Sequence, residues 1–493
     1  MPYADNGVSV LARSFLLQDT CRSKFAKMVM RLGPFDGRKR RFRCIGCSKA
    51  HLKCSGKQPC TVCTKKGVEC IFEKAESSKV IIHRDTRTHQ TAASFRVTTW
   101  KPPISPQPIT EQEVFLFYFG DFSKYNNLTG RKGHGLADDV KGLALSRRDA
   151  HLTDAMLSIG ALQALKRISE DDERRRKYFY SAVKHYSQAV VGLKEHIRML
   201  PATVDDDRQT NILWTTFFLG LFELVNQIYA EAWLQHMIHG TARGLEAAGP
   251  SLCTTDNGRR FFQQARVMEV CRSIFFNSPT FLTAPDWMHM LRRLSSKERL
   301  PLDSLLDIIV MCTSLRVKIE KALADRDALS CEPPSEEMYA VAADGMKLRR
   351  ALVVWQESYG EPIDARSTMV EDEAMLLCHI FFAAVSIYLS GAFDYETEHW
   401  VGHDVQIPTL SEVEINQHRQ DTMDLVDLGM KRSSLSPVLF LFPLHIAGAR
   451  ATSERDRTRI RILLEAIGKR FAVVTAVRNS LEVVWDHRKA VEA

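Results

Sequence analysis

The sequence has none of the short motifs that mark the common enzyme active sites. It contains no GxxxxGK[ST] phosphate loop, no GxGxxG dinucleotide fingerprint, no GxSxG nucleophile elbow and no HExxH zinc-protease pair. Each of these motifs places a nucleophile, a metal ion or a phosphate-binding backbone, so its absence argues against one class of catalyst. We therefore expect that the chain is not an enzyme.

Two structural patterns are also missing. No stretch of useful length alternates apolar and polar residues, which argues against strands. No sustained apolar heptad lies between Ile71 and Thr110, which argues against a coiled-coil zipper in that segment. We expect a mostly α chain that is a monomer, or a dimer formed through its large helical domain.

Acidic residues are absent from residues 37–68, although they are common elsewhere in the chain. This segment carries ten Lys or Arg side chains, while the whole chain has a formal net charge of +8. The rest of the chain therefore sums to −2. The basic character is local, and it points to one nucleic-acid-binding site rather than to a basic surface overall.

The same basic segment is rich in cysteine. Half of the chain's twelve cysteines lie in 27 residues with the spacing C-x2-C-x6-C-x5-C-x2-C-x6-C. They are Cys44, Cys47, Cys54, Cys60, Cys63 and Cys70. A C-x2-C pair brings two sulfurs to the same side of a turn, where they can hold one metal ion. Six thiolates suit two Zn²⁺ ions if two of the sulfurs bridge both ions.

The cysteine spacing allows two other interpretations. A disulfide framework is disfavoured because no secretory signal peptide precedes the motif. A zinc staple without DNA binding is the second alternative. In either zinc reading, a segment of about 30 residues buries too little apolar surface to fold alone, so metal binding supplies its folding energy.

Residues 44–70, CIGCSKAHLKCSGKQPCTVCTKKGVEC, resemble the Zn2Cys6 binuclear cluster of fungal transcription factors. The resemblance implies two Zn²⁺ ions per chain, a nuclear protein, and double-stranded DNA and transcription machinery or co-regulators as partners. It also implies a role for each cysteine. Cys44 and Cys60 would bridge the two ions. Cys47 and Cys54 would complete the coordination of one ion, and Cys63 and Cys70 would complete that of the other.

In this family a short helix after the first C-x2-C pair reads a base triplet in the major groove. Here that helix would cover residues 48–53. The resemblance assigns base reading to His51, with Lys49 as a second contact. Lys53 matches the basic residue that usually precedes the third cysteine.

Two positions depart from the family pattern. Ser48 stands where the family usually has Arg or Lys, and Ala50 and His51 stand where it often has a basic pair. The family's triplet preference therefore does not transfer directly. An alternative function follows, in which the chain is a zinc-cluster interaction protein or co-regulator that has lost base-specific readout.

The run GRKRRFR precedes the first cysteine and is read as a nuclear-import signal, a phosphate-binding arm, or both. Its basic residues are Arg38, Lys39, Arg40, Arg41 and Arg43. Such side chains neutralise phosphates and make affinity depend on salt.

We expect four segments. Residues 1–36 form an N-terminal extension that is expected to be disordered, and residues 37–73 hold the basic arm and the cysteine cluster. Residues 74–110, rich in Ser, Thr and Pro, form a linker. Residues 111–488 read as one all-helical domain.

The helical region resembles the regulatory domain that follows zinc clusters in fungal factors. Three stretches carry this likeness, at 233–250, 279–287 and 442–457. The resemblance implies that the domain senses a small-molecule effector or contacts a partner. It also implies a regulator of RNA polymerase II genes, often those of one metabolic or secondary-metabolite gene cluster.

Apolar periodicity predicts helices across this region. They cover 111–121, 150–167, 171–199, 206–228, 229–248, 258–276, 302–326, 335–358, 369–391, 411–431 and 454–486. Residues 374–393 contain no Asp, Glu, Lys or Arg and are long enough to span a membrane. Acidic residues flank them on both sides and give no positive-inside signal, so we expect a buried helix and no membrane partner.

Overall fold

The computed structural model describes two compact units of the chain. One unit contains Asp19–Pro106 and the other contains Met1–Gln18 and Gln107–Ala493. The described residues are 59–67, 70, 110–145, 150–168, 172–198, 206–226, 240–294, 300–324, 335–361, 363–364, 370–394, 399–400 and 405–492.

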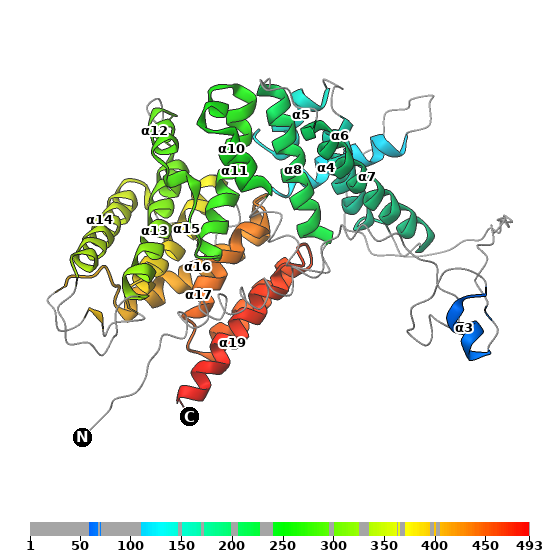
Figure 1. Cartoon of the computed structure of the whole chain (residues 1–493). Helices are drawn as coiled ribbons and strands as arrows, with labels where there is room; N and C mark the ends of the chain where they lie inside the picture. The colour runs from blue at the N-terminus through cyan, green and yellow to red at the C-terminus, as the bar shows by residue number, and fades with distance from the viewer. Residues whose placement is uncertain are drawn as a thin grey trace, which may run out of the picture. The chain divides into compact units, whose positions relative to one another are not determined.

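The larger unit is built from helices (Figure 1). Its α-helices are α4 (Glu111–Lys124), α5 (Leu136–Leu145), α6 (Ala150–Leu165), α7 (Asp172–Arg198), α8 (Asp206–Asn226), α10 (Ala242–Ala248), α11 (Asp256–Phe275), α12 (Pro285–Leu294), α13 (Pro301–Ala324), α14 (Glu336–Tyr359), α15 (Glu373–Gly391), α16 (Glu412–Arg432), α17 (Leu441–Ala449), α18 (Glu454–Gly468) and α19 (Val474–Glu492). The 3-10 turns are η2 (Pro250–Thr254), η3 (Phe281–Thr283) and η5 (Pro437–Phe440). The described residues contain no strand beyond one isolated bridge, Asn127 with Leu435, so the predicted mostly α fold is confirmed.

Two helices begin at capping boxes, each with a Thr or Ser followed three residues later by Glu. The Thr110 hydroxyl accepts the Glu113 N–H at 3.3 Å, and the Glu113 carboxylate accepts the Thr110 N–H at 2.7 Å. Ser411 and Glu414 repeat this arrangement at the start of α16. These reciprocal bonds satisfy backbone donors that have no partner within the helix.

Helix α15 lies at the centre of the core and packs against α13, α14, α16 and α17 (Figure 1). Among the described residues it is the one helix long and apolar enough to cross a membrane. In this structure, 83% of its most apolar window is buried inside the domain. Its length and composition are therefore those of a central core helix, as expected from its acidic flanks.

Helix α6 packs against α4 so closely that a glycine is required at the contact. A Cβ atom on Gly160 would lie 1.9 Å from the carbonyl oxygen of Phe115. The two helix backbones are therefore too close together to admit a side chain at residue 160. This contact fixes how the first helices of the domain pack together.

A short loop joins the beginning of the domain to its last third. The Asn127 N–H donates to Ser434 O at 3.0 Å, and the Ser436 N–H donates to Asn127 O at 2.8 Å. Gly130 in the same loop has φ +70 and lies against the backbone of Ala374. Residues far apart in the sequence are thus held by backbone hydrogen bonds.

The helix predicted for residues 454–486 is wrong as a single helix. Helix α18 ends at Gly468 and α19 begins at Val474, with Phe471 buried in the turn between them. The N–H groups of Arg470 and Phe471 both donate to Ile467 O, at 2.9 and 3.1 Å. The turn buries an apolar residue as a helix would, so the apolar periodicity does not reveal the break.

Periodicity also missed three short helices. They are α5, α12 and α17. Helix α17 is buried along nearly its whole length and contains Pro443, so it shows no polar face and carries a helix-breaking residue. Of the segment predicted as 229–248, only residues 240–248 are described. The other predicted helices agree with the observed ones to within four residues at each end.

The contact between α4 and α6 can be tested with one methyl group. Gly160→Ala should lower the free energy of unfolding by about 1–3 kcal/mol or more, because the backbone must move to admit the Cβ atom. Gly142→Ala on α5 is the matched control, since an added Cβ there meets nothing within 4 Å. That variant should gain about 0.5–1 kcal/mol from helix propensity. Urea unfolding of the intact chain measures both, and equal stability of the two variants would contradict the close contact.

Candidate metal centre

Three of the six clustered cysteines come together in the smaller unit. The Sγ atoms of Cys60, Cys63 and Cys70 all lie within 4.8 Å of one another, and all three residues are buried. None of the three is in a disulfide. This arrangement forms around one short helix, α3 (Thr61–Lys66) (Figure 1).

Local backbone geometry explains why Cys60 and Cys63 share a side. Cys60 is the N-cap of α3 with φ −77 and ψ 150, and its Sγ accepts the Cys63 N–H at 3.3 Å. The helix ends at Gly67, whose φ of 62 lets its N–H reach the carbonyls of Cys63 and Thr64. A single helical turn therefore presents both sulfurs in the same direction.

Cys70 joins the pair through a second backbone contact. The Cys60 N–H donates to Cys70 Sγ at 3.2 Å. Two of the three sulfurs thus accept backbone N–H groups, as a thiolate ligand does more strongly than a neutral thiol. Zn–S bonds of about 2.3 Å place the sulfurs of one tetrahedral ion roughly 4 Å apart, so the three residues fit zinc.

All the other predicted site residues lie outside the described residues. These are Cys44, Cys47, Cys54, Lys49, His51, Lys53, Arg38, Lys39, Arg40, Arg41 and Arg43. The structure therefore brings together three of the six expected zinc ligands, and the assignments of the remaining residues stay predictions.

Two basic residues near the centre were not predicted as contacts. Lys65 and Lys66 form the last turn of α3, and both are exposed. The internal repeat carries a signal that could have found them, because Lys65 stands two residues after a C-x2-C pair, as Lys49 does. The described half of the cluster thus presents positive charge to solvent.

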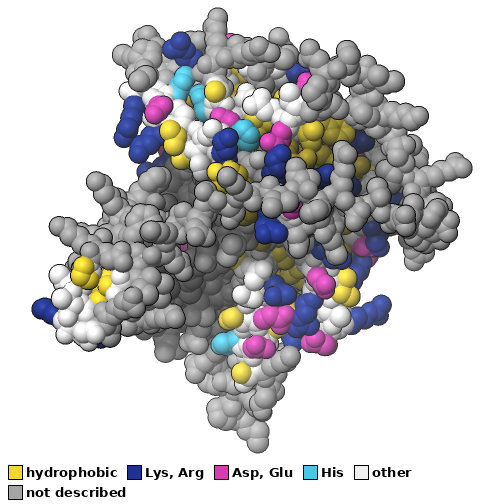
Figure 2. Space-filling model, turned by 90° about the vertical axis from the view of Figure 1, so that its right-hand side faces the viewer, with side chains coloured by type: hydrophobic (Ala, Val, Ile, Leu, Met, Phe, Trp, Pro, Cys, Tyr) yellow, Lys and Arg dark blue, Asp and Glu magenta, His cyan; other side chains and the backbone are white. Residues whose placement is uncertain are grey.

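Charge elsewhere is more mixed. On the face shown in Figure 2, Lys and Arg side chains of the described residues are interspersed with Asp and Glu. This matches a chain whose positive excess comes from residues 37–68. The described part of the helical domain offers no comparable single-sign segment on that face.

The described cysteines of the helical domain are chemically different from the cluster. Burial raises the pKa of the Cys253 thiol and of the Cys312 thiol to about 12. Burial also raises the pKa of Cys271 and Cys378. Such thiols stay protonated and unreactive near neutral pH, and no further group of metal-ligating side chains is found within the described ranges.

Two histidines of the same domain, His445 buried and His418 half-buried, are also unsuited to acid–base chemistry near neutrality. Burial lowers the pKa of His445 to about 4, and its Nε2 lies 3.1 Å from Ser480 Oγ. Burial, reinforced by Arg349, lowers the pKa of His418 to about 4. Both side chains are neutral at physiological pH and serve packing.

Comparisons with known proteins agree with both units. Residues 142–492 match the fungal specific transcription factor domain, and residues 42–79 match the fungal Zn(2)-Cys(6) binuclear cluster domain. A stretch of 62 residues is 36% identical to the transcription activator of gluconeogenesis ERT1 of Kluyveromyces lactis. That match covers 13% of this chain and 12% of the relative's length. No solved structure matches the chain.

The first of these domains covers more than half of the chain, and the second contains all six clustered cysteines. Members of the family bind zinc and DNA, regulate transcription and are typically nuclear. The chain belongs to the family defined by the fungal specific transcription factor domain, and it carries a fungal Zn(2)-Cys(6) binuclear cluster domain.

Proposed function

We propose that the chain is a nuclear, sequence-specific regulator of RNA polymerase II genes, acting on one metabolic or secondary-metabolite gene cluster. The observation that carries the proposal is the buried cluster of Cys60, Cys63 and Cys70, built on a helix whose last turn exposes two lysines. The Kluyveromyces lactis relative is named as an activator of gluconeogenesis. That name supports control of metabolic genes.

The proposed centre holds two Zn²⁺ ions through six cysteines. Cys60 would bridge both ions, together with Cys44. The hydrogen bonds of Cys60 support its place beside Cys63 and Cys70, because its Sγ accepts the Cys63 N–H and its N–H donates to Cys70 Sγ. Zinc would supply the folding energy of residues 37–73, while the protein supplies the turn geometry and the surrounding positive charge.

In the proposed DNA complex, Lys49, His51 and Lys53 face the base edges and nearby phosphates. The arm at residues 37–43 neutralises further phosphates and positions the module. Exposed Lys65 and Lys66 add to this positive surface. Because residues 37–68 contain no carboxylate, no acidic side chain of this segment opposes the approach of DNA.

The second candidate function is a zinc-cluster co-regulator without base readout. Ser48, Ala50 and His51 favour it, since they replace basic residues that the family commonly places on its reading helix. The helical domain would then supply the interaction with partners. The two candidates differ in whether the purified protein selects a DNA sequence.

The metal assignment predicts a defined stoichiometry. The intact chain should hold two zinc ions, and Cys60→Ala should lose both, because a bridging sulfur serves each ion. Cys271→Ala should keep both, since that half-buried thiol lies on α11 in the other unit. Elemental analysis after gel filtration measures the content. One tightly retained zinc in the Cys60 variant would contradict the bridging role.

The DNA assignment predicts two distinct mutant phenotypes. His51→Ala should change preference at one base pair by about 1–3 kcal/mol. Replacing both Arg40 and Arg41 by Ala should weaken all sequences and reduce the salt slope by about 2. Selection from a random DNA pool, followed by salt titration, separates the two effects.

The wild-type protein is the reference for this selection. Failure to enrich any motif at moderate salt would reject base readout and favour the co-regulator. If His51→Ala instead behaves like the arginine variant, His51 is a phosphate contact and not a base reader.

A further inference from the structure

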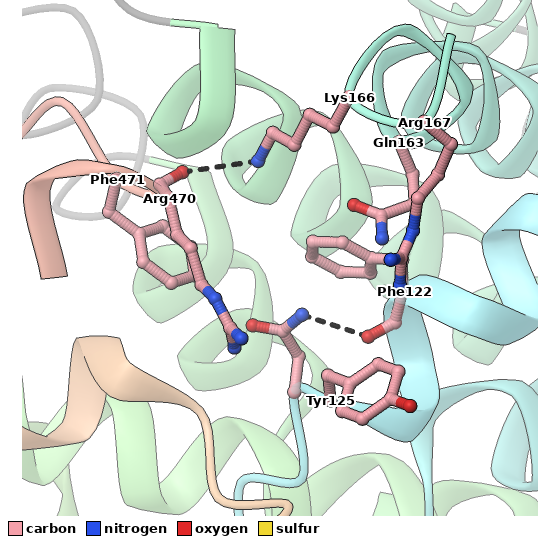
Figure 3. A pocket seen from close by; sticks show the side chains of 8 residues that line it. Phe122, Tyr125, Gln163, Lys166, Arg167, Arg470 and Phe471 are labelled. Atoms are coloured by element: carbon pink, nitrogen blue, oxygen red, sulfur yellow. Dashed lines mark hydrogen bonds between the residues drawn. The ribbon is translucent and has the colours of Figure 1, made fainter. Parts of the chain in front are cut away.

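A pocket opens on the helical domain where distant parts of the chain meet (Figure 3). Its walls come from the ends of α4 and α6 and from the turn between α18 and α19, and its volume is about 180 Å³. Lys166 reaches across from the α6 side, and Arg470 comes from the opposite wall (Figure 3). The Lys166 Nζ donates to the Arg470 carbonyl at 3.5 Å, across 304 residues of sequence.

The pocket carries excess positive charge. Three cations line it, Lys166, Arg167 and Arg470. Arg167 is paired with Asp121 at 3.1 Å, and Gln163 donates to the same carboxylate at 2.8 Å. Within the described ranges no carboxylate lies within ion-pair distance of Lys166 or Arg470. Among the described residues, Asp121 is thus the acid that is paired with these three cations, through Arg167.

Two effects disfavour the charged form of Lys166. Although much of the Lys166 side chain is exposed, crowding by surrounding protein atoms lowers its pKa to about 8, and the neighbouring Arg470 adds to this effect. A lowered pKa means that, relative to water, the surroundings of Lys166 favour its neutral form over the charged ammonium ion. An anion between Lys166 and Arg470 would stabilise the charged form.

The remaining walls are aromatic. Phe122 and Phe471 are buried, and the Tyr125 side chain is partly exposed at the rim. Flat apolar walls beside a few cationic and amide groups are the usual composition of a small-molecule site. The volume admits only a small ligand.

We propose that this pocket binds a small organic anion, whose carboxylate or phosphate group lies between Lys166 and Arg470 and whose apolar part contacts the aromatic walls. Binding links α6 to the α18–α19 turn and so stabilises the packing of the first helices against the last. The site is contained in the helical domain, and its occupancy does not depend on the proposed reading of DNA.

The test uses the full-length protein and two probes, inorganic phosphate and benzoate, at constant ionic strength set with NaCl. Calorimetric titration gives affinity, and thermal unfolding gives the stabilisation expected when a ligand binds the folded state. Tighter binding of phosphate identifies a phosphate ligand, and tighter binding of benzoate identifies a carboxylate with an apolar part.

Variants assign the site. Lys166→Gln and Arg470→Gln should each weaken binding of the preferred probe at least tenfold. Both side chains are exposed, so the fold should persist, and circular dichroism checks this. Lys469→Gln is the matched control, because it removes an exposed charge from the same turn without lining the pocket. Its affinity should stay within twofold of wild type.

Three results would overturn the proposal. They are no binding of either probe at 10 mM, unchanged affinity in both pocket variants, or equal weakening in the Lys469 control. DNA selection with Arg470→Gln in probe-free buffer tests the DNA proposal separately, because this variant changes the pocket and none of the proposed DNA contacts. A wild-type protein that binds benzoate here but selects no DNA would reject base readout and leave the anion site standing.

Discussion

The helical domain depends on burying α15, whose residues after Glu373 carry no charge. A buried helix end leaves carbonyl groups that must find other donors. Arg316 on α13 donates to the terminal Gly391 O at 2.7 Å, and Arg349 on α14 gives Ser386 O, inside the helix, an additional donor at 3.0 Å. These charged donors fix the register of α13 and α14 against α15, so apolar burial and polar satisfaction specify the same packing.

The smaller unit is held by a different kind of interaction. Its described core consists of Cys60, Cys63 and Cys70, with Val62 packed against them. Apolar burial on that scale cannot offset the entropy of ordering the chain. By the proposed zinc assignment, metal–thiolate bonds carry its stability, whereas the helical domain is held by its extensive apolar core. A chelator and a denaturant consequently act on different parts of one protein.

Sequence patterns predicted those features that depend on residues close together in the chain. The spacing of Cys60 and Cys63 predicted two sulfurs on the same side of a turn, and apolar periodicity predicted most of the helices. The same periodicity failed at Phe471, because a turn that buries its apolar residue continues the pattern of a helix. It failed again at α17, whose complete burial removes the polar face that periodicity needs. The roles of the first three cysteines and of His51 remain predictions from the sequence.

The anion pocket could not have been found from sequence, because Lys166 and Arg470 meet only in the folded domain. Several interactions act where the first and last parts of the domain join. Backbone bonds from Asn127 to Ser434 and Ser436 hold these parts together. Lys166 also donates to the Arg470 carbonyl across this junction, while desolvation by surrounding protein atoms and the Arg470 charge lower the pKa of Lys166. An anion bound between these two cations would act in the same direction as the backbone bonds. A regulatory domain with this construction can register a small ligand as a change in packing between its two ends, without any large movement of its core.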